Sequence, residues 1–315
     1  MMKTFLLLAT IMISLPRAQT CCSAGTPILS AIDGQASSAG NLRLALNYDF
    51  NRILDVYNGN RAITALRQRQ TQAVLLNISY GFSDRWGVDV LLSYIRHQRQ
   101  LNTANINGSL DELVTAGLGD ALLMLKYNVL VPDVIGQRQL TLGAGVKVPL
   151  GTADLKNSGI LLPADMQPGT GSWDFAGWML FSQGLLPAWP LTLTLRSSLR
   201  LNGGNNRFGV AGDSRFSSYR FGGVYTLSAA MHYRYEETIL SLQGRFRYSG
   251  RDRFAGQAVS NTGGRWFYLT GGLTVNRWAP FSGQLLLTLP LWRNVNEVQL
   301  TTSYRLTTVV SWYFQ

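Results

Sequence analysis

The side chains best suited to chemistry in this 315-residue chain are basic ones that recur at every second position of apolar repeats. Successive side chains of a β-strand leave on opposite faces, so each repeat places its charges on one face and its apolar residues on the other. Carboxylates share the polar face but are outnumbered there by more than two to one. The basic set is Lys126, Lys147, Arg196, Arg200, Arg220, Arg234, Arg245, Arg247 and Arg305, and the acidic set is Asp89, Asp120 and Asp174.

These charges would line the lumen if the strands close into a barrel with their apolar faces outward. A cationic excess in a narrow lumen focuses positive potential and draws anions in. The pattern then predicts a weakly anion-preferring path for small acids, aromatic or aliphatic, with the arginines of residues 196–247 on one wall. The alternative is that the arginines pair with the few carboxylates and fill a small barrel, as interior side chains commonly do.

Hydrolysis is the competing chemistry, because a nucleophile activated by a histidine is a frequent catalytic device. His97 and His232 are the only histidines, and His97 stands in a basic stretch with no serine close in sequence. His232 shares its face with Ser228, but four positions along a strand span about 13 Å, beyond hydrogen-bond reach. We therefore predict no enzymatic activity.

No metal or cofactor site is predicted. Cys21 and Cys22 are the only cysteines, and two adjacent sulfurs neither staple a fold nor complete a zinc site. An incidental or regulatory role is favoured over metal capture or acylation. The glycines of residues 143–145 and 169–171 lack the spacing and following helix of a phosphate loop. Those of residues 169–171 instead shape a long loop, residues 149–171, that we expect to fold inward as a constriction.

The elements that position these charges are clearest at the end of the chain. Residues 304–314 alternate between an apolar and a mostly polar set, which is a strand pattern of period two. Their length matches a tilted membrane-crossing strand of about 9–11 residues. The apolar set is Tyr304, Leu306, Thr308, Val310, Trp312 and Phe314, and Arg305 therefore points inward.

Composition agrees with a membrane barrel. Charged residues make up 14% and apolar residues 46% of the chain, which is too little charge for a typical soluble enzyme, and the net charge is +11. No run after the N-terminus approaches the roughly 18 apolar residues that a spanning helix needs. Only closed strands or helices satisfy backbone polar groups in lipid, so a membrane-spanning chain of this kind must be a barrel.

Three segments are predicted. Residues 1–18 have a basic start, a short apolar core and a small-residue exit, which is the pattern of a secretory signal peptide. Residues 19–40 form a periplasmic or short plug-like segment, and residues 41–315 form the barrel. The chain is therefore expected in the bacterial outer membrane.

The fold class predicted is an all-β, antiparallel, up-and-down transmembrane β-barrel of about twelve strands. Short periplasmic turns alternate with long polar loops such as residues 51–70 and 97–116, an asymmetry typical of outer-membrane barrels. Tyrosines and tryptophans near strand ends suit an interfacial girdle. The alternative is a soluble β-sandwich, in which the apolar faces would form the core.

Four motifs resemble one family. Residues 117–127, 145–151, 167–174 and 289–305 are similar to the outer-membrane proteins grouped as "meta-pathway of phenol degradation" transporters, distant relatives of the long-chain fatty-acid and aromatic-hydrocarbon channels. The resemblance implies passive movement of small molecules across the outer membrane and does not imply phenol. The chain departs from the fatty-acid channels in lacking an N-terminal hatch, and Gln315 displaces the usual terminal phenylalanine inward.

The expected function is thus a porin-like channel, with a structural or adhesive barrel as the alternative. Expected partners are outer-membrane lipids, lipopolysaccharide, the barrel-assembly machinery and a small-molecule substrate. Basic charge in an exported barrel is not a nucleic-acid signal, and no nucleic-acid motif is present. Loop arginines, Arg69, Arg99, Arg251 and Arg253 among them, are expected to make the outer rim basic.

Overall fold

The computed structural model describes residues 39–64, 67–101, 111–131, 138–186, 189–206, 208 and 218–314. The predicted signal peptide, residues 1–18, and most of the predicted segment 19–40 lie outside these residues. Within the described part of the chain, none of the helices has the length and apolar character needed to cross a membrane.

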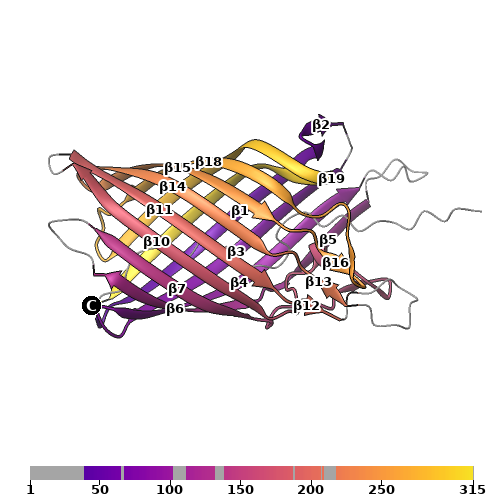
Figure 1. Ribbon diagram of the computed structural model, residues 1–315, viewed down its shortest axis with the longest axis horizontal. Helices are drawn as coiled ribbons and strands as arrows, with labels where there is room; N and C mark the ends of the chain where they lie inside the picture. The colour runs from indigo at the N-terminus through magenta and orange to yellow at the C-terminus, as the bar shows by residue number, and fades with distance from the viewer. Residues whose placement is uncertain are drawn as a thin grey trace, which may run out of the picture.

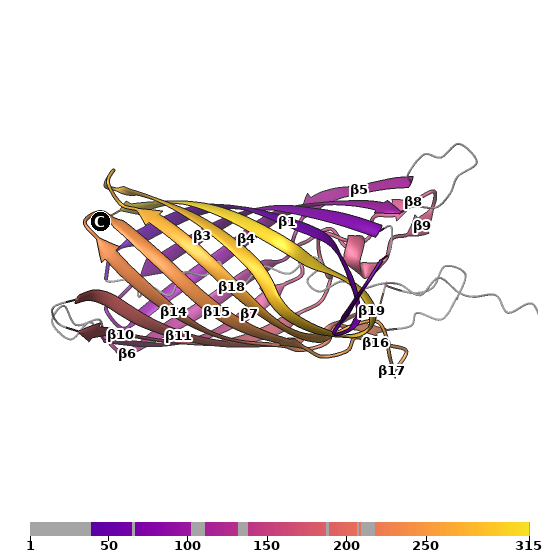
Figure 2. The ribbon, with the colours of Figure 1, turned by 90° about the horizontal axis from the view of Figure 1, so that it is seen from above.

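Antiparallel strands close into a single ring (Figures 1 and 2). Neighbours in the ring are neighbours in sequence, and β19 pairs with β1 to close it. The ring therefore has no free edge, which a barrel requires. Its members are β1 (Leu42–Gly59), β3 (Arg67–Gly81), β4 (Trp86–Leu101), β6 (Ala121–Leu130), β7 (Gln139–Val148), β10 (Asp174–Leu186), β11 (Trp189–Asn202), β14 (Val224–Tyr235), β15 (Thr238–Ser249), β18 (Gly264–Val275) and β19 (Phe281–Phe314).

The last of these elements crosses the barrel twice. Residues 283–295 of β19 pair with β18, and residues 298–314 pair with β1. The amide of Tyr313 donates to the carbonyl of Pro280 at 3.1 Å, so the two halves lie side by side. The chain reverses at Glu297, whose φ of 54° is the left-handed geometry of a tight turn. Of the eleven ring elements, ten cross once and β19 crosses twice, giving the twelve passes predicted.

Side chains alternate between the two faces of the wall, as predicted. On β1, Leu46 and Tyr48 are 54% and 41% exposed on the outer face, whereas Asn47 and Asp49 are buried on the inner face. On the final pass, Val310 is exposed and Ser311 is buried. Apolar groups thus cover the outside, and polar groups line much of the lumen beside a buried apolar cluster on β3, β4, β6 and β10.

Several strands run further than the sequence predicted. Residues 51–70 and 97–116 were predicted as polar loops, which is wrong for most of them. β1 continues to Gly59, β3 starts at Arg67, β4 continues to Leu101, and β5 (Asp111–Leu118) pairs with β4. Polar side chains support one another there, as where Arg52 Nη1 donates to Gln70 Oε1 at 2.8 Å across the β1–β3 pair.

The two ends of the barrel differ. Short turns and the C-terminus lie at one end, called here the turn end, and the longer connections lie at the other, called the loop end (Figure 1). At the loop end, a four-stranded sheet extends the wall. It is made of β12 (Gly204–Asn205), β13 (Tyr219–Arg220), β16 (Arg253–Phe254) and β17 (Gln257–Ala258), while β2 (Arg61–Ile63), β8 (Lys156–Asn157), β9 (Ile160–Leu161) and the 3₁₀ turn η2 (Ala164–Met166) complete the elements.

Candidate functional site

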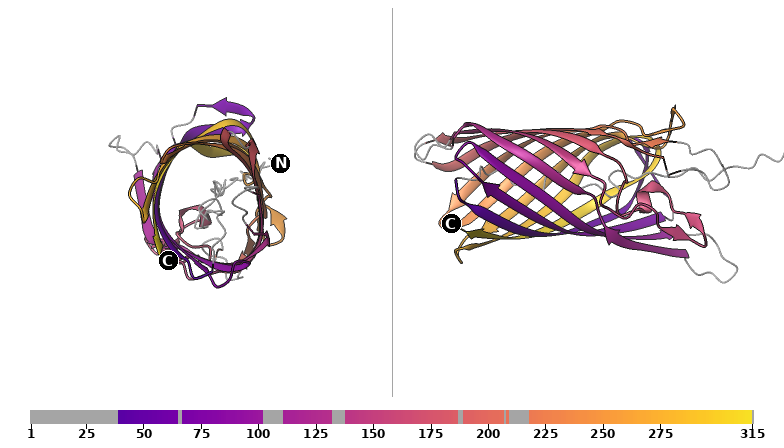
Figure 3. Two further views of the ribbon diagram at one scale, coloured as in Figure 1. Left: turned by 90° about the vertical axis from the view of Figure 1, so that its left-hand side faces the viewer. Right: turned by 90° about the horizontal axis from the view of Figure 1, so that it is seen from below.

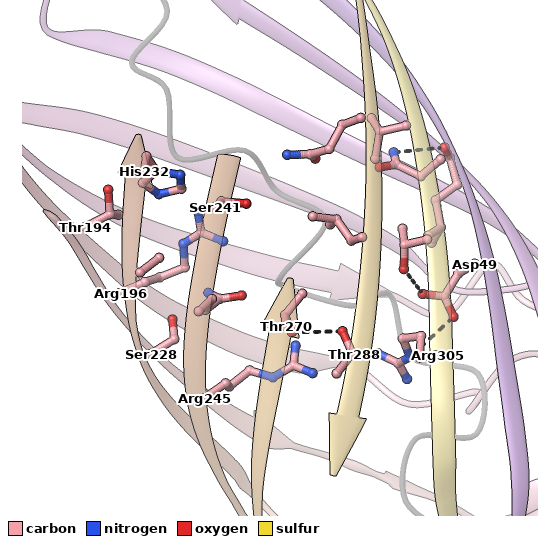
Figure 4. A pocket seen from close by; sticks show the side chains of 18 of the residues that line it. Asp49, Thr194, Arg196, Ser228, His232, Ser241, Arg245, Thr270, Thr288 and Arg305 are labelled. Carbon is pink, nitrogen blue, oxygen red and sulfur yellow. Dashed lines mark hydrogen bonds and ion pairs between the residues drawn. The ribbon is translucent and has the colours of Figure 1, made fainter. Parts of the chain in front are cut away.

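A cavity of about 170 Å³ lies against the inner wall formed by β1, β11, β14, β15, β18 and β19 (Figure 4). Its charged lining consists of four arginines and one carboxylate, so positive charge dominates. Hydroxyl and amide side chains occupy much of the rest. The lining residues that matter here are Arg43, Arg196, Arg245, Arg305, Asp49, His232, Ser228 and Ser241.

The strand register places two of the arginines, Arg196 and Arg245, on either side of one serine. Arg196 on β11 lies opposite Ser228 on β14, which in turn lies opposite Arg245 on β15. Strands are about 4.8 Å apart, so the two arginines leave the wall about 10 Å from each other. Both side chains line the cavity, and in Figure 4 their guanidinium groups are directed away from Ser228. The guanidinium carbon of Arg245 also lies 5.0 Å from the ring centre of Tyr268 on β18.

The cavity carboxylate is held by neighbours on its own wall. Arg305 Nε lies 3.5 Å from Asp49 Oδ1, and Thr307 donates to Asp49 Oδ2 at 3.0 Å. Arg43 Nη2 donates to Ser311 Oγ at 2.7 Å. With Asp49 matched to Arg305, the cavity keeps a cationic excess, and guanidinium groups recognise carboxylates well because they present several donors in one plane.

The predicted lysines and acids have a different role, because they neutralise one another. Lys126 Nζ lies 2.5 Å from Asp89, and both side chains are buried. Lys147 Nζ lies 2.7 Å from Asp120 and 3.0 Å from Asp174. The structure thus divides the predicted basic set into paired lysines and cavity arginines.

The remaining predicted residues spread around the barrel. Arg200 is buried on the inner face, and the Arg247 guanidinium carbon lies 5.3 Å from the ring centre of Trp266. Arg234 is exposed beside the β14–β15 turn. Arg220 was predicted in the lumen-lining set, but it lies outside the strands of the ring. It belongs to the separate strand β13 and its side chain is exposed.

A loop folded into the barrel packs against the lysine network. This inner loop, residues 149–173 between β7 and β10, contains η2 and is buried throughout residues 164–170. Figure 3, which looks along the barrel axis, shows a segment in the colour of η2 inside the ring. Asp120 holds both ends of the loop, because its carboxylate accepts from the amides of Gly151 at 3.2 Å and Thr170 at 2.9 Å. The predicted inward loop is present.

The tip of the inner loop is bound to β3 and β4 by two arginines that were predicted elsewhere. Arg69 was predicted on an exposed rim, but it is 3% exposed and its Nη1 lies 3.2 Å from Asp165 Oδ2. Arg99 Nη1 lies 3.8 Å from the same carboxylate oxygen. Burial raises the pKa of the Asp165 carboxyl, while Arg69 and Arg99 act in the opposite direction. Thr115 donates to the carbonyl of Met166 at 2.6 Å.

The two histidines lie apart. His97 is fully buried, with Nδ1 3.0 Å from Thr71 Oγ1. His232 lines the cavity, and its cross-strand partner is Ser241 on β15. Sequence spacing gave only Ser228 as a neighbour, because the register that brings Ser241 opposite His232 comes from the β14–β15 turn.

The fold and this lumen define a closed antiparallel β-barrel of twelve passes, apolar outside and charged inside. No known family model and no curated protein matches the sequence. Among solved structures, the chain is similar to an outer membrane channel from Pseudomonas putida F1, with 14% identity over 90% of this chain and 99% of that one and a TM-score of 0.68.

Two further structures are more distant. The β domain of the Bordetella autotransporter BrkA gives 11% identity over 86% of this chain and 99% of that one, with a TM-score of 0.49. The TodX monoaromatic hydrocarbon channel gives 11% identity over 89% and 91%, with a TM-score of 0.46. The similarity to the outer membrane channel establishes the barrel fold. The other two similarities are too low to support any conclusion.

Proposed function

We propose that this protein is an outer-membrane channel through which small molecules move passively, with a preference for small carboxylic acids. The observation that carries the proposal is the cavity in which four arginines face one carboxylate. In a confined lumen with walls of low dielectric, such an imbalance raises the local concentration of anions.

The size and chemistry of the cavity narrow the substrate class. A cavity of about 150 Å³ can hold benzene, so this volume suits a solute of about one aromatic ring. Planar guanidinium groups bind carboxylates through paired hydrogen bonds and stack on aromatic faces. Small aromatic and aliphatic acids therefore suit Arg196 and Arg245 better than neutral sugars or amines do.

Two likenesses support this proposal. The barrel is similar in fold to an outer membrane channel. Its sequence motifs resemble the "meta-pathway of phenol degradation" group, to which we propose it belongs. An outward apolar surface with Tyr80, Trp86 and Trp312 exposed near strand ends suits the interfaces of a bilayer.

Reversal potentials of single channels in a salt gradient test the proposal. The wild-type protein in a planar bilayer is expected to prefer anions. Arg196→Gln/Arg245→Gln removes two of the four cavity cations and is expected to lower the anion-to-cation permeability ratio by about tenfold. Arg85→Gln, in the exposed turn between β3 and β4, is the matched control and should change the ratio little.

Cation preference in the wild type would contradict the proposed selectivity. An absence of conductance would contradict transport itself and favour a structural or adhesive barrel, in which interior arginines only fill space. Liposome swelling with benzoate, glucose and an amine then ranks the solutes, and benzoate is expected to enter fastest.

A further inference from the structure

The four-stranded sheet at the loop end carries basic side chains on its outer face. Arg220 on β13 and Arg253 on β16 are direct cross-strand partners, and both are exposed. Arg251, two residues before Arg253, is exposed as well. Like charges placed directly opposite each other destabilise a strand pair unless an anion lies between them.

The carboxylate nearest in sequence does not neutralise these arginines. Asp252 Oδ2 accepts from the hydroxyl of Tyr219 at 2.5 Å, and Oδ1 accepts from the amide of Gly222 at 2.7 Å. Tyr219 belongs to a buried cluster on the inner face of the sheet, with Ala164 of the inner loop. Asp252 therefore accepts hydrogen bonds on the inner side of the sheet, and the outer face keeps its positive charge.

A fourth arginine continues the same outer surface toward the barrel. Arg265, near the start of β18, is exposed and lies opposite Tyr248 of β15, which is 44% exposed. Tyr225 is the next outward residue around the ring, since it pairs with Tyr248. On the outer surface, the basic side chains thus follow directly after the outward tyrosines in the direction of the loop end.

The four arginines have no carboxylate within ion-pair distance in the part of the chain that the structure describes, unlike Arg69, Arg293 and Arg305. This outer basic patch, defined as Arg220, Arg251, Arg253 and Arg265, stands at the loop end (Figures 1 and 2). In a barrel whose loops face outward from the cell, it would lie level with the headgroups of the outer leaflet.

We propose that the outer basic patch binds the phosphate groups of lipopolysaccharide. Arginine suits this ligand because its planar donors match phosphate oxygens in pairs. The two outward tyrosines beside the patch, Tyr225 and Tyr248, give the same lipid a flat surface at the interface. The proposal rests on the outer-membrane placement but not on conduction through the lumen.

Native mass spectrometry of the detergent-solubilised barrel tests this site with lipid A as the probe. The wild type is expected to retain lipid A, and Arg220→Gln/Arg253→Gln/Arg265→Gln to retain severalfold less. Dephosphorylated lipid A should bind the wild type as weakly as lipid A binds the variant. The matched control, Arg85→Gln/Arg234→Gln, removes exposed arginines beside turns at the other end and should bind like the wild type.

Equal retention of lipid A by the triple variant and the wild type would overturn the proposal, as would equal binding of lipid A and its dephosphorylated form. Folding of each variant is checked by the heat-dependent shift in gel mobility typical of closed barrels. Conductance of the triple variant in bilayers free of lipopolysaccharide should match the wild type. A barrel that binds lipid A but does not conduct would contradict only the proposed channel.

Discussion

Lysines and arginines share one pattern in the sequence but divide the lumen between them. Lysine carries a compact charge that a carboxylate can neutralise at short range, whereas arginine spreads its charge over a plane with several donors. Lys147 accordingly lies between Asp120 and Asp174, fully buried. Arg196 and Arg245 keep their guanidinium groups at the cavity.

Replacing the buried lysine should leave two carboxylates without a counter-charge. Lys147→Met removes the cation between Asp120 and Asp174 and is expected to lower the free energy of unfolding by about 3–5 kcal/mol. Lys156→Met removes an exposed lysine on β8 and should change the free energy of unfolding by no more than about 0.5 kcal/mol. Denaturant titration of both variants in lipid vesicles measures the two free energies of unfolding. Equal values would show that the ion pairs of Lys147 do not stabilise the barrel.

The direction of most charged side chains was predictable, but their partners were not. Alternation alone fixes that Lys126 and Arg305 point inward, since a strand has period two. The pairing of Lys126 with Asp89 depends on the register between β6 and β4, which the connecting residues determine. Asp49 and Arg305 meet only because the first and last strands close the ring.

At the scale of elements, the inner loop depends on close backbone contact. A Cβ added at Gly151 would lie 2.7 Å from Gly169 Cα and 2.7 Å from Gly119 C, so both ends of the loop and the β5–β6 connection touch there. Backbone atoms cannot rotate away as a flexible side chain can. Glycine is therefore required for this packing.

Adding one methyl group at this contact should displace the inner loop. Gly151→Ala is expected to lower the free energy of unfolding by about 1–3 kcal/mol, because overpacking forces backbone shifts. Single-channel conductance should rise as the loop leaves the lumen. Gly271→Ala, at an exposed position with nothing within 4 Å of the added Cβ, is the control and should leave conductance unchanged. Unchanged conductance in Gly151→Ala would show that the loop does not restrict the path.

Strands that alternate apolar and polar residues were predicted correctly, and those that are polar on both faces were not. The ends of β3 and β4 at the loop end carry arginine and glutamine, a composition that also suits loops. The end of β1 contains apolar residues, but register shifts between Arg52 and Asp55 break its alternation. Hydrogen bonds across the strand pair, such as the one from Arg52 to Gln70, hold them extended. β5 ends at Leu118 and β6 begins at Ala121, so the chain leaves the strand at Gly119 and Asp120, where the carboxylate holds the inner loop.

The whole molecule reverses the usual distribution of apolar groups. Leucines, valines and aromatic residues cover the outside of the ring. Ion pairs, hydroxyls and amides line much of the inside, together with a buried apolar cluster that includes Leu91, Met124 and Trp178. This distribution excludes the soluble sandwich that composition left open, in which the apolar faces would meet each other. A closed ring with such a surface satisfies its own backbone and needs an apolar solvent around it.

Two adjacent leucines on β19 test the outward apolar surface, because the same substitution by aspartate can be made on the inner and on the outer face. Leu287 is 46% exposed on the outer face, and Leu286 lines the arginine-rich cavity. Both lie near the middle of the pass formed by residues 283–295, where lipid would be driest. Leu287→Asp is expected to lower the free energy of unfolding in vesicles by about 1–3 kcal/mol, since a charge facing lipid near the midplane is unfavourable.

Leu286→Asp should be the milder of the two changes, because its carboxylate enters a polar cavity beside four arginines. It should also reduce the proposed anion preference, which Leu287→Asp should leave as it is. The measurement is denaturant unfolding of both variants in the same vesicles, with reversal potentials on the same preparations. A barrel whose outer face met water would tolerate Leu287→Asp within about 0.5 kcal/mol, and that outcome would overturn the placement in a membrane.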